Sequence, residues 1–269
     1  MSTITLSCGY LLPAAAAAGM AVLTALQRAG LAPEWSRKLL HVGCGLLALS
    51  LPWLCGRAPT VLTLCSVAAL MLVAVRFIPA WNRKLGGALD GVGRGHRGAF
   101  YFVAAIGLVF AGAGGDRLLF CLPIAVLTFA DAAAALVGRR LGVHRFRTGS
   151  GWKSLEGSGA FFAVGLAAAF GCLSAFDGGD PARHLPMALL LALLLTFVEA
   201  AAGKGLDNLL IPVVGQLALR AYLGFAAADL IAHLCAAAAS GILVAQQVRR
   251  HLPSVDSEPW RTTCGLRTR

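Results

Sequence analysis

Apolar residues in this chain come in blocks of about twenty, and this spacing limits the folds that the chain can adopt. A helix needs about 20 apolar residues to cross the roughly 30 Å hydrocarbon core of a bilayer. Hydrophobic residues make up 58% of the 269 residues, and charged residues make up only 13%. A soluble domain typically has about 25% charged residues, because its surface must be solvated. The sequence therefore predicts an integral membrane protein.

The blocks predict an all-α, polytopic bundle of transmembrane helices, because backbone groups in lipid must form their hydrogen bonds within the segment. One transmembrane catalytic domain is expected over 1–252, followed by a disordered cytoplasmic tail over 253–269. Arg220 and Asp229 fall inside the last two predicted spans, where they could pair with each other. We expect nine spans, with eight as the alternative, near residues 9–27, 40–56, 59–79, 99–114, 118–137, 158–176, 186–202, 208–223 and 225–247.

Lysine and arginine are distributed unevenly between the two sets of predicted loops, in a chain whose net charge is +11. One set of loops and span ends carries fourteen of them: Arg28, Arg37, Lys38, Arg76, Arg83, Lys84, Arg94, Arg97, Arg139, Arg140, Arg145, Arg147, Lys153 and Lys204. The opposite set carries three: Arg57, Arg117 and Arg183. Basic residues collect in cytoplasmic loops, so the first set is predicted to face the cytoplasm, in a bacterial inner membrane. Few aromatic residues interleave with these cations, which argues against a nucleic acid partner.

Four polar residues recur at helical spacing where the second predicted span begins. Glu34, Arg37, Lys38 and His41 are three or four residues apart, so they share one face of a helix. They would place a carboxylate, two cations and an imidazole at the membrane surface. The alternative is an interfacial anchor in which Glu34 pairs with Lys38.

Asp131 is an acid in an otherwise apolar span, six residues before Val137, where the basic loop is expected to begin. That spacing puts it about 9 Å along the helix from the loop. An ionisable residue at this depth is costly in lipid and by default marks a functional site. Ala134, Ala135 and Gly138 are small and leave room for a ligand or a neighbouring helix.

The loop after this span combines cations, glycines and hydroxyl groups. It follows Arg139 and continues as G-S-G-W-K-S-L-E-G-S over 149–158, with Lys153 at its centre. Glycines let backbone amides approach phosphate oxygens, lysine adds a point charge, and hydroxyl groups can bond phosphate or a bound metal. The alternative is a flexible basic loop, with Asp131 paired to a cation.

A third polar cluster follows the seventh predicted span. It contains Glu199, Lys204, Asp207 and Asn208. The last two offer hard oxygen ligands, which suit Mg²⁺. The alternative is that one of them caps the next helix.

Three other patterns predict no chemistry. The G-x-G-x-x-G match over 93–98 follows no strand, so it is a chance match. The eight cysteines form no C-x-x-C pair and are expected to pack as small apolar residues. His184 and His233 are isolated in the sequence and predict no metal site.

Taken in order, the polar clusters resemble four motifs of the phytol kinase and dolichol kinase family of polytopic membrane enzymes. Residues 34–41 resemble E-x-x-R-K-x-x-H, and residues 131–139 resemble D-x-x-A-x-x-x-G-R. Residues 153–158 are similar to K-S-x-E-G-S. Glu199 followed by residues 205–212 is similar to E…G-x-D-N-x-x-x-P. Four motifs in one order are much more specific than any one of them.

The chain departs from this family at two places. Trp152 precedes Lys153, where the family often has paired lysines. A G-E-x-Y-F stretch common in the family appears as G-A-F-Y-F over 98–102, without its carboxylate. The related phosphatidate cytidylyltransferases also carry a late H-G-G-x-x-D-R-x-D signature, which this sequence lacks. The balance of motifs favours a kinase.

The resemblance implies phosphoryl transfer from CTP, with Mg²⁺, to a lipid alcohol such as phytol, farnesol, geranylgeraniol or a longer polyprenol at the cytoplasmic membrane face. It implies that the catalytic residues are Asp131, Lys153, Glu156 and Glu199, the two glutamates either orienting loops or accepting the hydroxyl proton. The implied metal ligands are Asp131, Asp207 and Asn208. The implied nucleotide contacts are Arg37, Lys38, His41, Arg139, Ser154 and Gly157.

Two alternative functions stay open from the sequence. One is a phosphatidate cytidylyltransferase. The other is a transporter or a non-catalytic membrane scaffold, in which Asp131, Arg220 and Asp229 would line a pathway. Neither the alcohol nor the oligomeric state follows from the sequence.

Overall fold

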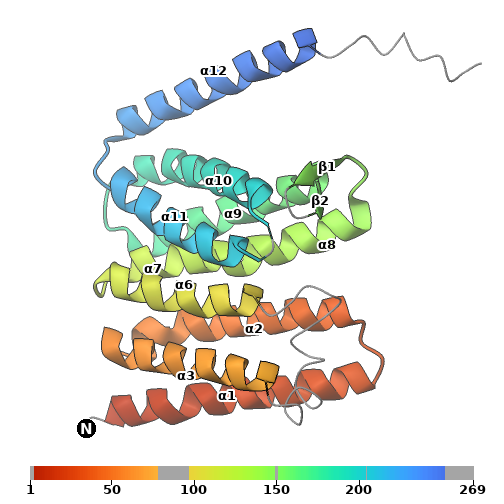
Figure 1. Cartoon of the computed structure of the whole chain (residues 1–269). Helices are drawn as coiled ribbons and strands as arrows, with labels where there is room; N and C mark the ends of the chain where they lie inside the picture. Colours follow the sequence, from red (N-terminus) through yellow and green to blue (C-terminus); the bar gives the residue numbers. More distant parts are fainter. Residues whose placement is uncertain (1–2, 78–96, 149–150, 204, 252–269) are drawn as a thin grey trace, which may run out of the picture.

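Most consecutive helices run in opposite directions along one axis in the computed structural model, which describes residues 3–77, 97–148, 151–203 and 205–251 (Figure 1). The helices confirm the predicted all-α class for this part of the chain, apart from one short hairpin. The longer helices are α1 (Thr3–Arg28), α2 (Pro33–Leu54), α3 (Ala58–Phe77), α6 (Arg97–Ala113), α7 (Arg117–Ala125), α8 (Asp131–Leu141), α9 (Leu155–Phe176), α10 (His184–Ala201), α11 (Asp207–Tyr222) and α12 (Ala227–His251).

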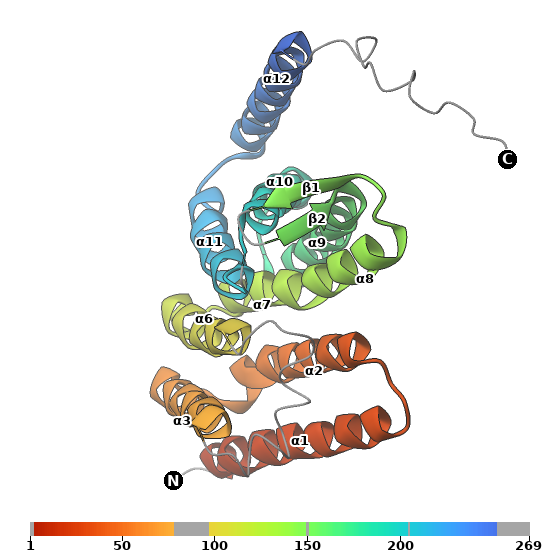
Figure 2. The ribbon, with the colours of Figure 1, turned by 45° about the vertical axis from the view of Figure 1, so that its right-hand side comes forward.

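Helix α7 forms the centre of the bundle. Every residue from Leu118 to Ala125 is buried, as expected for a helix that is apolar on all sides. It contacts α2, α6, α9 and α11. On one side of this centre lie α1, α2 and α3, and on the other lie α9, α10 and α11, whereas α12 contacts α10 at the edge of the bundle (Figures 1 and 2). Asp116 fixes the start of α7, because its side chain accepts hydrogen bonds from the amides of Leu118 and Leu119.

Three segments of the described chain are long and apolar enough to cross a membrane: Arg117–Leu141, Leu155–Phe176 and Pro181–Ala201. The expected count of eight or nine spans is not supported. Helices α6 and α11 have 17 and 16 residues, which corresponds to about 25 Å at 1.5 Å per residue and falls short of the hydrocarbon thickness.

Large apolar side chains face outward on several helices. Leu70 in α3, Leu108 in α6 and Phe197 in α10 are 68%, 58% and 72% exposed. A protein in water rarely exposes a large continuous apolar surface. Contact with lipid tails explains this surface, in agreement with a membrane protein.

The connection between α8 and α9 differs from the expected loop. The helix continues to Leu141, so Arg139 and Arg140 occupy its last turn instead of the loop. An antiparallel hairpin follows, with β1 (Arg145–Thr148) paired to β2 (Gly151–Ser154). Each strand has only four residues, the shortest run over which alternation can identify a strand, which is why the hairpin was not predicted.

The predicted pairing of Arg220 with Asp229 is wrong. Arg220 donates a hydrogen bond to the carbonyl of Gly112 at the end of α6. Asp229 accepts one from the amide of Ala226 and so caps the start of α12. The predicted tail, together with Arg83, Lys84, Arg94 and Lys204, lies outside the described residues.

At the end of the bundle where α9 meets α10, His184 is not isolated as the sequence indicated. Its Nε2 lies 3.2 Å from Asp177 Oδ2, and both side chains are largely buried. The neighbouring Arg183, in a short 3₁₀ turn η3 (Pro181–Arg183), donates a 2.6 Å hydrogen bond to the carbonyl of Leu223. These contacts join the ends of α9, α10 and α11 on this side.

A π-helical turn, η2 (Val126–Ala130), interrupts the path between α7 and α8. Such turns are frequent at functional sites because they shift the helix that follows. Thr128 in this turn donates a 2.7 Å hydrogen bond to the carbonyl of Ile124. Gly45 of α2 packs directly against Thr128, and a Cβ atom at Gly45 would overlap that side chain. The absent side chain at Gly45 therefore lets α2 approach the π turn.

Replacing Gly45 by alanine tests this contact. We expect Gly45→Ala to lower the free energy of unfolding by about 1–3 kcal/mol, because it overpacks a buried interface. Gly43→Ala is a matched control in the same helix, since a Cβ at Gly43 would meet no atom within 4 Å. Unfolding of both variants in mixed detergent micelles measures the difference. Equal stabilities would show that the α2–η2 contact can relax.

Candidate active site

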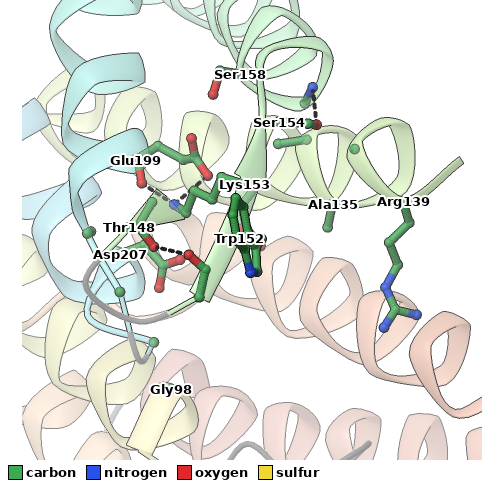
Figure 3. A pocket seen from close by; sticks show the side chains of 18 of the residues that line it. Gly98, Ala135, Arg139, Thr148, Trp152, Lys153, Ser154, Ser158, Glu199 and Asp207 are labelled. Atoms are coloured by element: carbon green, nitrogen blue, oxygen red, sulfur yellow. Dashed lines mark hydrogen bonds and ion pairs between the residues drawn. The ribbon is translucent and has the colours of Figure 1, made fainter. Parts of the chain in front are cut away.

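The bundle brings five distant segments to one of its ends, where they surround a cavity of about 770 Å³ (Figure 3). That volume is typical of a small-molecule site. The segments are the start of α2, the start of α6, α8 with the hairpin and the start of α9, the end of α10, and the start of α11. Every predicted site residue except Glu156 lines the cavity: Arg37, Lys38, His41, Asp131, Arg139, Lys153, Ser154, Gly157, Glu199, Asp207 and Asn208.

Asp131 is held by two residues of α2. Lys38 Nζ lies 2.6 Å from Asp131 Oδ2, and the two side chains are only 5% and 15% exposed. His41 Nε2 lies 3.6 Å from the same oxygen and 3.2 Å from the carbonyl oxygen of Leu127 in the π turn. Buried charges need such partners, since an isolated ion in an apolar interior is very costly. The structure thus pairs Lys38 with an acid of another helix, whereas the anchor alternative paired it with Glu34.

Lys153 and Glu199 form the second ion pair of the cavity, with Nζ 2.7 Å from Oε1 (Figure 3). Lys153 also donates to the carbonyl oxygen of Glu199, so it holds the end of α10 in two places. The other carboxylate oxygen, Glu199 Oε2, is buried and accepts no hydrogen bond from the described residues. A buried acceptor without a donor is costly. The site therefore contains a carboxylate oxygen suited to a proton or a cation.

Asp207 and Asn208 begin α11 and face the same cavity. Asn208 donates a 3.0 Å hydrogen bond from Nδ2 to the carbonyl of Gly98, which ties α11 to α6. Asp207 does not form the capping bond of the alternative interpretation, because the residue before the helix is Leu206, and within the described part of the chain Asp207 accepts only from the next amide at 3.1 Å. Burial raises the pKa of Asp207, and the nearby negative charge of Asp131 raises it further. A cation near these two carboxylates would relieve that repulsion.

The oxygen donors fit Mg²⁺ that shares its coordination with a substrate. Asp131, Glu199, Asp207 and Asn208 all line the cavity. Among the described residues, no three histidine, cysteine, aspartate or glutamate side chains lie close enough to hold a metal by themselves. Mg²⁺ sites in phosphate-transferring enzymes use one or two carboxylates plus substrate phosphates instead of a complete protein cage. The donor set agrees with that kind of site.

Sequence reasoning missed several residues of the cavity wall. Arg97 and Arg145 line it, although the sequence counted them only as loop cations, because neither lies in one of the four motifs. Gly98 also lines it. A Cβ added at Gly205, whose φ is +85°, would lie within 3 Å of the Gly98 backbone. The close approach of these two glycines joins the starts of α6 and α11 and closes one side of the cavity.

Ser154 and Gly157 set the start of α9 as well as lining the cavity. The Ser154 hydroxyl accepts a 3.1 Å hydrogen bond from the amide of Gly157, which caps the helix. A Cβ at Gly157 would lie 2.9 Å from the carbonyl oxygen of Ala134 in α8. The K-S-x-E-G-S motif therefore has a structural task here, because it lets α9 begin against α8.

Glu156 points away from the cavity wall. Its Oε1 lies 2.7 Å from His144 Nδ1 and accepts a 3.0 Å hydrogen bond from the His144 amide. His144 directly precedes the hairpin. Of the two roles expected for Glu156, the contacts match that of orienting the loop.

Substitution of Lys38 tests the buried pair. We expect Lys38→Met to lower the free energy of unfolding by about 3–5 kcal/mol, because it leaves Asp131 charged, buried and without its lysine. The double variant Lys38→Met/Asp131→Asn should recover most of that loss, since it removes both charges of this pair. Arg140→Met is the control, because it removes only an exposed cation above the Trp35 ring. Unfolding in detergent measures all three, and an unaffected single variant would contradict a strongly coupled pair.

The chain is similar to a phytol kinase from Synechocystis sp., with 29% identity over 204 residues, which cover 74% of this chain and 85% of the relative. No family model matches the chain, and no solved structure matches it. The similarity extends over about three quarters of the chain and supports the resemblance to phytol kinases that the four ordered motifs indicate.

Proposed function

We propose that this protein is a kinase that transfers the γ-phosphoryl group of CTP, with Mg²⁺, to a lipid alcohol such as phytol at the cytoplasmic membrane face. One observation carries the proposal: four motif segments, far apart in sequence, surround a single cavity with paired carboxylates and cations. The similarity to a phytol kinase independently suggests a polyprenol-type kinase.

The arrangement suits phosphoryl transfer, which depends mainly on positioning and on neutralising phosphate charge. Arg37, Arg139 and Lys153 would bind the phosphates, and each of them lines the cavity. Asp131 and Asp207, with Asn208, would hold the Mg²⁺, which supplies charge neutralisation when bound. The ion pairs that hold Asp131 and Glu199 fix these groups before a substrate arrives, so little reorganisation is needed during the reaction.

Glu199 is the better of the two glutamates to accept the hydroxyl proton. Its Oε2 is buried, has no hydrogen-bond partner among the described residues, and belongs to a residue that lines the cavity. Glu156 instead bonds His144 outside the cavity wall. In the proposed step, the alcohol oxygen bonds to the γ-phosphorus as its proton passes to Glu199. The bond from that phosphorus to the bridging oxygen breaks, and CDP leaves.

The lipid substrate would arrive from the bilayer. The cavity lies at the end of helices whose outward side chains are largely apolar, including Leu108 and Phe197. An isoprenoid tail can therefore lie along the bundle while its hydroxyl group reaches the polar cavity.

The transporter alternative fits less well. It required Asp131, Arg220 and Asp229 to line one pathway. Asp131 belongs to the cavity, whereas Arg220 bonds Gly112 at the end of α6 that is remote from Gly98. Asp229 caps α12.

An assay of the purified protein with γ-labelled CTP and phytol tests the proposal. We expect labelled phytyl phosphate and unlabelled CDP. Asp207→Asn should lower kcat by about 100-fold or more, because it removes a carboxylate that would hold the Mg²⁺ beside the transferring group. Asp229→Asn is a matched control, since it changes another aspartate in the first turn of a helix and lies outside the cavity. We expect this control to retain activity.

Two results would contradict the proposal. Release of pyrophosphate with formation of a CDP-lipid would identify a cytidylyltransferase. Equal turnover by Asp207→Asn and the unmodified protein would show that the cavity is not the site of the reaction.

A further inference from the structure

Trp152 is an exposed aromatic residue on the wall of a polar cavity. It lies on β2, lines the cavity, and keeps 66% of its surface exposed. The next residue, Lys153, reaches inward to Glu199, and the indole ring stands beside it (Figure 3). A side chain of this size usually gains stability by burial. Packing against the described residues leaves most of the Trp152 side chain uncovered.

Two other tryptophans show what a partnered ring looks like in this protein. Arg140 lies over the Trp35 ring at 5.0 Å, and Arg117 lies over the Trp53 ring at 5.4 Å. Both arrangements are typical cation–π contacts. Among the described residues, the Trp152 ring has no such cation and no aromatic neighbour. One of its faces is therefore available to a ligand of the cavity.

The rest of the cavity wall indicates the chemistry of that ligand. Arg97, Arg139 and Arg145 line the cavity, together with Lys153. Cations of this density favour phosphate groups. A phosphate group alone does not stack on an aromatic ring, and a lipid tail forms no ion pairs with arginine. A nucleotide combines an anionic end with a flat π system that stacks on aromatic side chains.

We infer that Trp152 is the stacking platform for the nucleobase of the phosphoryl donor; this inference rests on the proposed function. The base lies against the indole ring while the phosphates extend past Lys153 into the cavity. Every nucleobase has a π face, so stacking contributes affinity with little selection among bases. Trp152 then raises the affinity for CTP and UTP alike, and the preference between them comes from other contacts.

Steady-state kinetics of the full-length protein in detergent or nanodiscs tests the inference. We expect Trp152→Ala to raise the KM for CTP about tenfold, a size within the range of a lost base–aromatic contact. The KM for UTP should rise by the same factor, while kcat and the KM for phytol change less than about twofold. Trp152→Phe keeps an aromatic face and should restore most of the affinity. Trp35→Ala is the control, since Trp35 is outside the cavity wall.

Intrinsic fluorescence provides a readout that does not depend on turnover. The chain has five tryptophans, so the Trp152 contribution is obtained by subtracting the spectrum of Trp152→Phe. Saturating CTP should quench this contribution. Inorganic tripolyphosphate should compete with CTP without quenching, because it carries the charge but no base.

The possible failures are distinguishable. Phosphorylation of phytol from CTP with an unchanged KM in Trp152→Ala would overturn the platform and leave the kinase standing. Absence of CTP quenching would overturn it as well. Quenching of Trp152 by brominated phospholipid that CTP does not relieve would show a membrane anchor instead. Saturable CTP quenching in a protein that phosphorylates no alcohol would support the platform and contradict the kinase.

Discussion

The arrangement of the site depends on the burial of one charge, that of Asp131. A carboxylate inside a bundle of apolar helices is tolerated only with a partner, and Lys38 supplies it at 2.6 Å. This requirement couples α2 to α8, although 93 residues separate the two side chains. Breaking the pair leaves one charge in an apolar interior, so the α2–α8 contact and the ionised state of Asp131 depend on each other. The same physics joins Lys153 to Glu199 and thereby the hairpin to α10.

Close backbone contacts let these charges meet. Gly45 lets α2 approach the π turn closely, and Gly157 lets α9 approach α8. Gly205 lies close to Gly98, where the starts of α11 and α6 meet. Small residues at such crossings bring helices together in membrane proteins, where lipid tails remove most of the hydrophobic drive for association. The polar wall of the cavity is thus held by helix contacts on its several sides, and by hydrogen bonds such as that from Asn208 to Gly98.

The sequence predicted the part of this arrangement that follows from the energetic cost of burying a charge. An acid deep in an apolar span had to be functional or paired, and Asp131 proves to be paired and to line the cavity. The helix positions followed from the apolar blocks, but the number of spans did not, because helices such as α6 are apolar without being long enough. The partner of Lys38 was hidden, since Glu34 at four residues' distance was an equally good neighbour on spacing alone. The contact of Arg97 with the cavity leaves no local pattern in the sequence.

The π turn lets α7 and α8, which continue one another through the centre of the bundle, orient their side chains independently. One residue corresponds to about 100° of rotation in an α-helix, so a regular path through 126–130 would swing Asp131 away from α2. With the wider turn, α7 presents apolar side chains in every direction, while α8 directs an acid at one neighbour. Substitutions that change the packing of α7 against its neighbours can therefore accumulate without rotating Asp131. A single residue inserted or deleted near the π turn would rotate Asp131 relative to α7 and end this independence.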